Sequence, residues 1–318
     1  MNRVMQVILV LCLLLVNVAK AEIYELPPPG YDVIGAVSTV TARHEDTLVD
    51  IARRHGLGYE DIVRANPDVN IWMPGEGTEV VLPTRFVLPA GPRRGVILNL
   101  AEYRLYYFPQ AAPGETAYVM TYPISIGRMD WETPLGLTKI ISKVNNPSWY
   151  VPQSVLDEHV VNGNPLPRIV PPGPDNPLGK FAMRLGLPGY LIHGTNRPAG
   201  VGMRVTHGCV RMFPEDIEFL FGKVNLNTPV RIINDPVKMG WDGNQLVMEV
   251  HPVLEVALPP EAVEAIQDEE PVAVAKDPLA YVTEQFIATT GERAGQLDWH
   301  LVEQVVDRSD GIPIPVGR

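Results

Sequence analysis

Cysteine is nearly absent from the sequence. Of 318 residues, Cys12 and Cys209 are the two cysteines, which excludes a small fold held together by several disulfides. Cys12 lies inside an apolar run and has no lipid-attachment motif around it. If that run is removed, Cys209 has no thiol partner in its own chain. An unpaired thiol in an exported protein either links to a partner or performs chemistry, and its neighbours decide which.

Long apolar runs are also scarce. The one near the start, Val4 to Val18, follows the basic residue Arg3 and precedes Ala19-Lys20-Ala21. A bilayer span needs roughly 20 apolar residues, which is more than this run offers. The pattern is typical of a secretory signal peptide over residues 1–21. We therefore predict an exported, soluble mature chain that begins near Glu22, with a retained N-terminal anchor as the alternative.

Positive charge is in deficit. The chain has 26 Lys and Arg against 37 Asp and Glu, a formal net charge of −11. Removal of the signal peptide takes away Arg3 and Lys20 and no acidic residue, so the mature charge becomes −13. This balance gives no electrostatic reason to expect binding to nucleic acid or to anionic lipid.

The length suits about two domains, and the segment 37–83 has the pattern of a small one. Its ends, Val37 to Val40 and Val80 to Leu82, alternate like strands, and the apolar residues between them follow helical spacing in two short stretches. A strand, two helices and a strand predict a compact α+β module.

This module resembles a LysM domain. The matching residues are Asp46-Thr47-Leu48, Ile51-Ala52, His55-Gly56, Ala65-Asn66-Pro67, Pro74-Gly75-Glu76 and Val80-Val81-Leu82-Pro83. The resemblance implies binding to N-acetylglucosamine-containing glycans, chiefly peptidoglycan. The opening Thr41 to Glu45 lacks the usual Pro-Gly of the family, so a purely structural spacer is the alternative.

Residues 94–233 are predicted to form a mostly β domain. Several β-branched and aromatic runs occur there, and one helix is expected to begin at Pro214-Glu215-Asp216. Before the module, residues 22–36 look like an extended lead-in. After the β domain, residues 234–318 are a C-terminal extension, with an acidic linker at 257–277 and two amphipathic helices. We assign no chemistry to this extension.

One segment of the β domain carries candidate chemistry. A strand-like run ends in His193-Gly194-Thr195, and Thr206-His207-Gly208-Cys209-Val210-Arg211 follows. A free thiol is only a few per cent ionised at neutral pH, so an imidazole within hydrogen-bond reach is its simplest activator. Gly208 lets the backbone approach a substrate closely, so that amides near Cys209 could face a developing oxyanion.

These residues resemble the signature of the L,D-transpeptidase (YkuD) family. Further matches are Ser125-Ile126-Gly127, Thr133-Pro134-Leu135-Gly136, Asn146-Pro147-Ser148-Trp149 and Asn176-Pro177-Leu178-Gly179, and Thr206 stands where many members have serine. The resemblance implies a mostly β, sandwich-like catalytic fold and a periplasmic location. It also implies attack by Cys209 on a peptidoglycan tetrapeptide, release of D-alanine, and transfer of the acyl group to an amine, without a cofactor.

The same resemblance implies roles for single residues. His193 would be the general base, and the amides of His207, Gly208 and Cys209 would bind the oxyanion, supported by Thr206. Gly194 and Thr195 are further candidates for substrate binding. Arg211 is a candidate for the same role from its own chemistry, because a guanidinium offers a planar fork to a carboxylate; a structural surface charge is the alternative for Arg211.

Several alternatives stay open from the sequence. The acceptor is a second diaminopimelate, the lysine of an outer-membrane lipoprotein, or water, which would make the enzyme a hydrolase. A non-catalytic wall-binding scaffold is a further possibility. His193, His207 and Cys209 could instead be zinc ligands, although two of them separated by one glycine are an unusual chelating pair.

Overall fold

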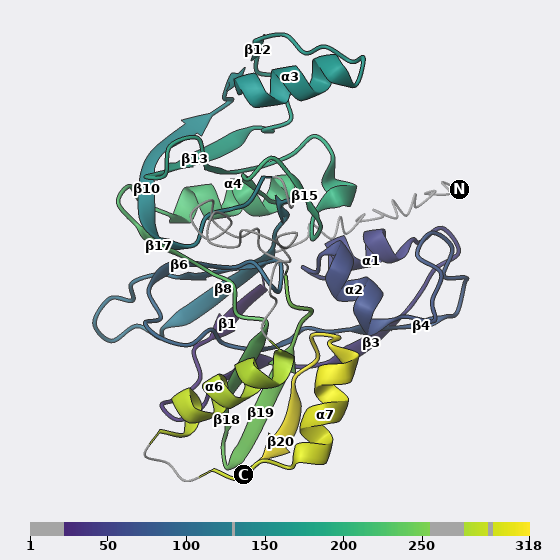
Figure 1. Ribbon diagram of the computed structural model, residues 1–318, viewed down its shortest axis with the longest axis vertical. Helices are drawn as coiled ribbons and strands as arrows, with labels where there is room; N and C mark the ends of the chain where they lie inside the picture. Colours follow the sequence, from purple (N-terminus) through teal and green to yellow (C-terminus); the bar gives the residue numbers. More distant parts are fainter. Residues whose placement is uncertain (1–21, 129–130, 255–276, 292–294) are drawn as a thin grey trace, which may run out of the picture.

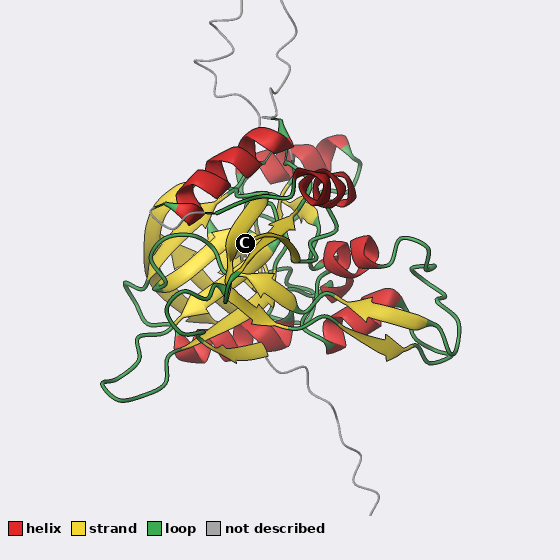
Figure 2. Ribbon diagram, turned by 90° about the horizontal axis from the view of Figure 1, so that it is seen from below, coloured by secondary structure: helices red, strands yellow, loops and turns green. Residues whose placement is uncertain are grey.

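A curled nine-stranded sheet forms the centre of the protein (Figures 1 and 2). The computed structural model describes residues 22–128, 131–254, 277–291 and 295–318. The predicted signal peptide and nearly all of the predicted linker 257–277 therefore lie outside the described residues. In spatial order the strands are β1 (Glu22–Glu25), β8 (Tyr118–Pro123), β7 (Arg104–Phe108), β6 (Gly95–Asn99), β17 (Pro229–Ile233), β10 (Gly136–Asn145), β13 (Phe181–Leu185), β14 (Leu191–His193) and β16 (Val210–Arg211).

The sheet is mostly antiparallel, with parallel pairs at β6–β17 and β14–β16. Helix α4 (Pro214–Lys223) packs against β13, and its Ile217 and Leu220 join the main apolar core. Pro214 stands in the first turn of α4, followed by Glu215 and Asp216, as predicted. The prediction of a mostly β fold is confirmed.

The N-terminal module contains β3 (Ser38–Thr41), α1 (Leu48–Arg54), α2 (Tyr59–Ala65) and β4 (Glu79–Leu82). Strands β3 and β4 pair antiparallel, in the predicted order of elements. Thr47 caps α1 through a reciprocal capping box with Asp50, which satisfies backbone donors that a helix start leaves free. Leu48, Ile51 and Ile62 are fully buried, so both helices are held by an apolar core.

This module shares its core with the central sheet. One apolar cluster joins Leu48 and Ile62 of the module to Tyr106 and Val119 of the sheet. Arg104 of β7, 1% exposed, pairs with Asp61 of α2 across the boundary. The module, at the right of Figure 1, is therefore packed against the sheet along a continuous interior.

The lead-in is more ordered than the sequence suggested. Strand β1 pairs with β8 and so joins the main sheet. Strand β2 (Val33–Gly35) pairs with β5 (Arg85–Val87). These strands have three or four residues each, too few for a period-two pattern to stand out among prolines and glycines.

The C-terminal extension forms a unit of its own, at the bottom of Figure 1. Helices α6 (Pro278–Thr290) and α7 (Trp299–Arg308) confirm the two predicted helices, and they pack on a three-stranded sheet that the sequence did not reveal. Its strands are β18 (Val237–Asp242), β19 (Gln245–Val250) and β20 (Ile314–Gly317). In the described parts of the chain, no helix is both long and apolar enough to cross a bilayer.

An arm projects from the top of the sheet in Figure 1. It contains β11 (Trp149–Tyr150), α3 (Gln153–Val161) and β12 (Ile169–Val170), with a small apolar cluster separate from the main core. Asn176 fixes the base of the arm, because its side-chain amide donates to the carbonyls of Pro147, Val170 and Pro171 at 2.9–3.2 Å. This contact gives a structural reason for the Asn176-Pro177-Leu178-Gly179 motif.

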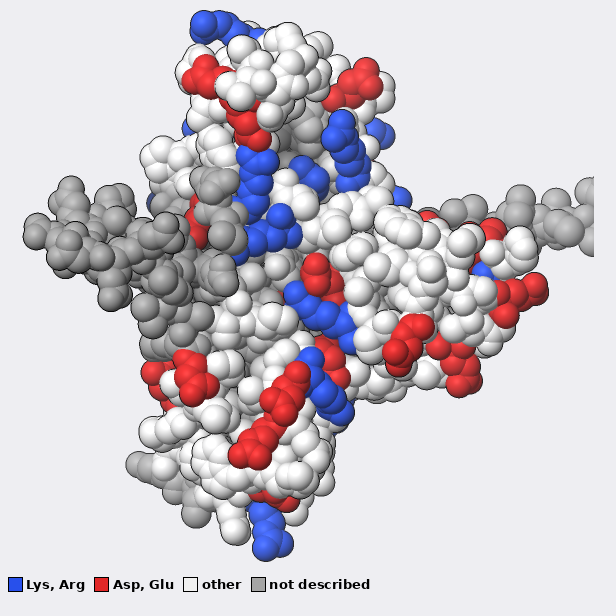
Figure 3. Space-filling model, turned by 45° about the vertical axis from the view of Figure 1, so that its right-hand side comes forward, with Lys and Arg blue, Asp and Glu red and all other residues white. Residues whose placement is uncertain are grey.

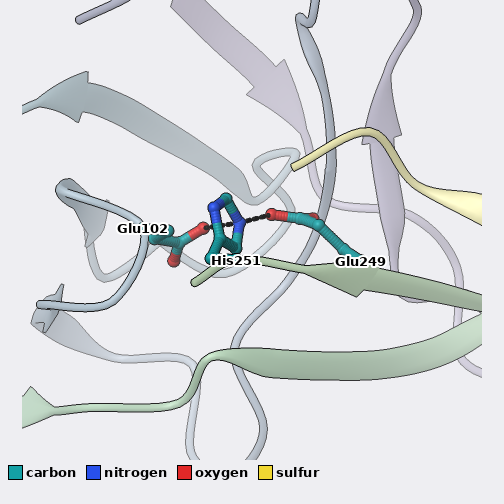
Figure 4. Close-up of side chains that lie close together, drawn as sticks. All are labelled: Glu102, Glu249 and His251. Atoms are coloured by element: carbon teal, nitrogen blue, oxygen red, sulfur yellow. Dashed lines mark hydrogen bonds and ion pairs between the residues drawn. The ribbon is translucent and has the colours of Figure 1, made fainter. Parts of the chain in front are cut away.

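A buried charge cluster joins the C-terminal unit to the sheet (Figure 4). Glu102 precedes β7, whereas Glu249 of β19 and the adjacent His251 come from the C-terminal unit, and all three are buried. Lys238 of β18 bonds to Glu102, to Glu249 at 2.8 Å and to the Val87 carbonyl at 2.8 Å. The cluster thus places one ammonium group between two carboxylates.

We predict that Lys238→Met lowers the free energy of unfolding by about 3–5 kcal/mol, because it leaves two buried carboxylates without their cation. Burial already raises the pKa of Glu102 and of Glu249. A raised folded-state pKa favours folding at low pH, so the loss should be smaller near pH 5 than near pH 8. Denaturant unfolding at both pH values measures this, and a loss that is larger near pH 5 would contradict it.

Candidate active site

Two neighbouring parallel strands bring His193 and Cys209 together. In the register of β14 and β16, Ile192 lies opposite Val210 and His193 opposite Arg211. Cys209 directly precedes β16, so it lies beside β14, two positions from the partner of His193. The parallel pairing thus places on one sheet edge two residues that are 16 apart in sequence.

A hydrogen bond to its neighbour orients His193. Nδ1 lies 2.7 Å from the Gly194 carbonyl oxygen. A carbonyl can only accept, so Nδ1 carries the proton, and in the neutral ring Nε2 keeps its lone pair as the basic nitrogen. Burial and, to a smaller degree, the charge of Arg211 lower the pKa of His193 to about 4. The ring is therefore neutral near pH 7 and able to accept a proton.

Cys209 is a partly buried thiol. Its Sγ lies 3.6 Å from the Gly189 carbonyl oxygen. Burial raises the pKa of the thiol, and a backbone hydrogen bond at Leu191 and the charge of Arg211 offset part of that rise. No hydrogen bond joins Sγ to His193 among the described residues. A neutral thiol therefore lies near a neutral imidazole, so any attack by Sγ would require a proton transfer.

The catalytic turn, from Thr206 to Cys209, is held by hydrogen bonds to its carbonyl groups. Thr206 Oγ1 donates to the Cys209 carbonyl at 2.6 Å, and Thr133 Oγ1 donates to the Gly208 carbonyl at 2.9 Å. Gly208 has a φ of +92°, which favours glycine at that position. The amides of His207, Gly208 and Cys209 donate to no other described residue. Their binding of an oxyanion stays a prediction.

Comparison with known proteins finds relatives over most of the chain. The YkuD model, described as the L,D-transpeptidase catalytic domain, matches residues 93–232. The probable L,D-transpeptidase YcfS of Escherichia coli K12 is 35% identical over 94% of this chain and 90% of its own length. The chain belongs to the L,D-transpeptidase family. YbiS of the same strain is 39% identical over 74% of this chain and 76% of its own length, and ErfK/SrfK of Salmonella typhimurium LT2 is 34% identical over 96% and 94%.

The arm of this L,D-transpeptidase contacts the catalytic turn through Glu158 of α3, a residue that the sequence analysis missed. Glu158 accepts from His207 Nε2 at 2.9 Å and from Arg128 at 2.6 Å. The edge of Trp131 packs on the His207 ring. Arg128 and His207 lower the pKa of Glu158 to about 2, so this carboxylate stays charged at any pH near neutrality. His207, predicted to support the oxyanion site, is thus tied to the arm.

Arg211 is a half-buried cation that has no ion-pair partner in the described parts of the chain. Its Nε is buried without a hydrogen-bond partner in the described chain, and no ion pair involves this side chain there. Burial and the nearby charge of Arg197 lower its pKa. Although the whole chain is acidic, Lys and Arg side chains occur down the middle of one face, interspersed there with Asp and Glu side chains (Figure 3). An anionic group of a ligand would relieve the repulsion between Arg197 and Arg211.

Gly194 and Thr195, the other predicted substrate-binding residues, are buried. The carbonyl of Gly194 accepts from His193, and Thr195 Oγ1 accepts from the Arg197 amide at 2.9 Å. In this structure both residues support the positions of neighbours. Their contact with substrate stays a prediction.

The residues considered as zinc ligands are not gathered as a ligand set. His207 Nε2 is bonded to Glu158, and Nδ1 of His193 is bonded to a carbonyl. Across the described residues, the one group of His, Cys, Asp or Glu with closely spaced ligand atoms is Glu102, Glu249 and His251. In that group, the ammonium of Lys238 already forms ion pairs with both carboxylates.

We predict that the thiolate absorbance of Cys209 appears only above the usual cysteine range of about pH 8.5, because burial raises the thiol pKa. Acylation of Cys209 should be nearly constant between about pH 5 and pH 8, and should fall as the pH drops through the His193 pKa of about 4. Ultraviolet titration and acylation rates measure both. A thiolate signal at pH 6 that His193→Ala abolishes would instead indicate a preformed ion pair.

We predict that Glu158→Gln slows acylation of Cys209 by about tenfold, since small displacements of a catalytic group are costly. The change removes the charge that binds His207 and Arg128. Asp157→Asn is the matched control, because Asp157 is exposed on the same helix and bonds to Gln153 within it. Equal rates for the two variants, measured with the same acyl donor, would show that the arm contact does not support the turn.

Proposed function

We propose that Cys209 carries the acyl group of a peptidoglycan tetrapeptide stem. Nε2 of His193 takes the thiol proton as Sγ attacks the carbonyl between meso-diaminopimelate and the terminal D-alanine. The resulting oxyanion binds the amides of His207, Gly208 and Cys209. The C–N bond then breaks, His193 returns the proton to the departing amine of D-alanine, and a thioester remains on Cys209.

The second half of the reaction uses the same groups in reverse. An acceptor amine attacks the thioester, His193 removes a proton from the amine, and the departing sulfur recovers it as a thiol. Arg211 binds a carboxylate of the stem peptide, for which its guanidinium, with Nε unpaired among the described residues, supplies a charged fork. No cofactor takes part in this sequence.

One observation supports this proposal most directly: the hydrogen bond from His193 to the Gly194 carbonyl, which leaves Nε2 as the free base beside the Cys209 strand. The membership of the chain in the L,D-transpeptidase family supports the reaction class. The amides of the catalytic turn support the oxyanion role, because preorganised donors are the largest single contribution in many acyl transfers.

The N-terminal module supports a cell-wall location for this reaction. We propose that residues 37–83 form a LysM module that binds the glycan of peptidoglycan, and that cleavage of residues 1–21 releases the protein into the periplasm. Residues 94–233 then act as the catalytic domain and 234–318 as an extension without chemistry of its own. When two linked sites of one protein engage the same polymer, the local concentration of stem peptide at the active site rises.

The acceptor decides the product. A second diaminopimelate gives a 3-3 cross-link, and a lipoprotein lysine gives an anchored outer-membrane protein. Incubation with a purified disaccharide-tetrapeptide separates transfer from hydrolysis. We expect cross-linked dimers and free D-alanine; disaccharide-tripeptide as the main product would establish a hydrolase.

We predict that Cys209→Ala abolishes product formation and the covalent mass shift that a carbapenem produces on the wild-type protein. Because the alanine leaves the module unchanged, binding to insoluble peptidoglycan should persist. Mass spectrometry and a sedimentation assay with purified sacculi measure the two properties. Unchanged products in the variant would overturn the assignment of the nucleophile, and wild-type protein that binds sacculi without turnover would identify a wall-binding scaffold.

A further inference from the structure

The first turn of α2 is bonded to the catalytic domain. The amides of Tyr59 and Glu60 donate to the carbonyls of Val201 and Gly202, at 2.9 and 3.3 Å. The first amides of a helix have no partner within the helix. Here the loop 200–203, which lies just before β15 (Arg204–Thr206) and the catalytic turn, supplies partners for two of them.

The two backbones approach too closely for a side chain between them. A Cβ added at Gly58 would lie 2.7 Å from Cα of Gly202 and 3.2 Å from Cβ of Pro123. Gly58 has a φ of −89°, which other residues adopt readily. Glycine at position 58 is therefore required by the close contact between the module and the loop, and not by the local backbone conformation.

Two ion pairs hold the module on this face. Arg53 of α1 makes a bidentate pair with Glu215 of α4, with N–O distances of 2.7 and 2.8 Å. Arg104 of the sheet pairs with Asp61, whose carboxylate also accepts from the Gly58 amide at 2.8 Å. The start of α2 is thus held by a contact with the sheet and by hydrogen bonds to loop 200–203.

The other side of the same loop reaches the active site. The Gly200 carbonyl accepts from Ser125 Oγ at 2.7 Å. Ser125 exchanges two backbone hydrogen bonds with Arg211, at 2.8 and 3.0 Å. A Cβ at Gly200 would lie 3.6 Å from Nη1 of Arg211, so the loop stands directly beside the guanidinium. A continuous set of contacts therefore runs from α2 through the loop to Arg211.

We propose that the N-terminal module is a positioning element of the active site: through Gly58 and the first turn of α2 it holds loop 200–203 in place, and so sets the position of Arg211 beside Cys209. This role rests on the proposed function of Cys209 and Arg211, and it differs from glycan tethering. Tethering helps only substrates that carry glycan. Positioning affects the reaction of Cys209 with any carboxylate-bearing acyl donor.

The test uses a donor that has no glycan. Gly58→Ala, in the full-length protein, places a methyl group against Gly202 without changing the catalytic domain. We expect acylation of Cys209 by a carbapenem, which bears a carboxylate, to slow by about tenfold or more, because a displacement of ~1 Å can cost ~100-fold. An unchanged rate would overturn the proposal, whereas a wild-type protein that is not acylated would overturn the proposed nucleophile instead.

A second pair of variants keeps the test valid if Gly58→Ala folds poorly. Arg53→Met removes the ion pair to Glu215 across the boundary, and Arg54→Met removes a pair to Asp46 inside the module at the same 2.7 Å distance. We expect Arg53→Met to slow the acylation and Arg54→Met to leave its rate unchanged. Equal rates for both variants would contradict the proposal.

A double variant separates positioning from general loss of structure. If the module acts through Arg211, adding Gly58→Ala to Arg211→Gln should slow acylation little beyond Arg211→Gln alone, since residues that act as a unit are not additive. Fully additive losses would show that the module does not act through Arg211.

Discussion

The proposed chemistry of this L,D-transpeptidase depends on one hydrogen bond, from Nδ1 of His193 to the carbonyl of Gly194. It decides which ring nitrogen carries the proton, and it fixes the plane of the ring next to the strand that follows Cys209. Burial then keeps the ring neutral, with a pKa of about 4. A buried neutral base beside a partly buried neutral thiol avoids the cost of holding two charges in a low-dielectric site before the substrate arrives.

The rest of the fold can be understood as support for that pair. The parallel contact of β14 with β16 brings the residues together. Thr133 and Thr206 hold the turn from inside the domain. Two outlying parts then reach the same region: the arm through Glu158, and the module through the loop that lies beside Arg211. The catalytic turn therefore depends on segments that are far from it in sequence.

The sequence was sufficient for some parts of this picture and not for others. Cys209 and His193 could be proposed as nucleophile and base, and expected near one another, because thiol, imidazole and glycine occur in a short segment with distinctive spacing. The helix at Pro214 could be placed because its start has local signals. Glu158 could not be found, because its contact with His207 is made across 49 residues by an arm without a recognisable pattern. The contact of the thiol with the Gly189 carbonyl depends on backbone packing that no local pattern encodes.

The most direct test of this account is the protonation state of His193 in the resting enzyme. Nitrogen chemical shifts of the imidazole, assigned with a His193→Gln variant, distinguish the two neutral tautomers from the imidazolium. The account predicts a neutral ring at pH 7 with the proton on Nδ1 and an unprotonated Nε2. A doubly protonated ring at pH 7, paired with a Cys209 thiolate, would contradict it.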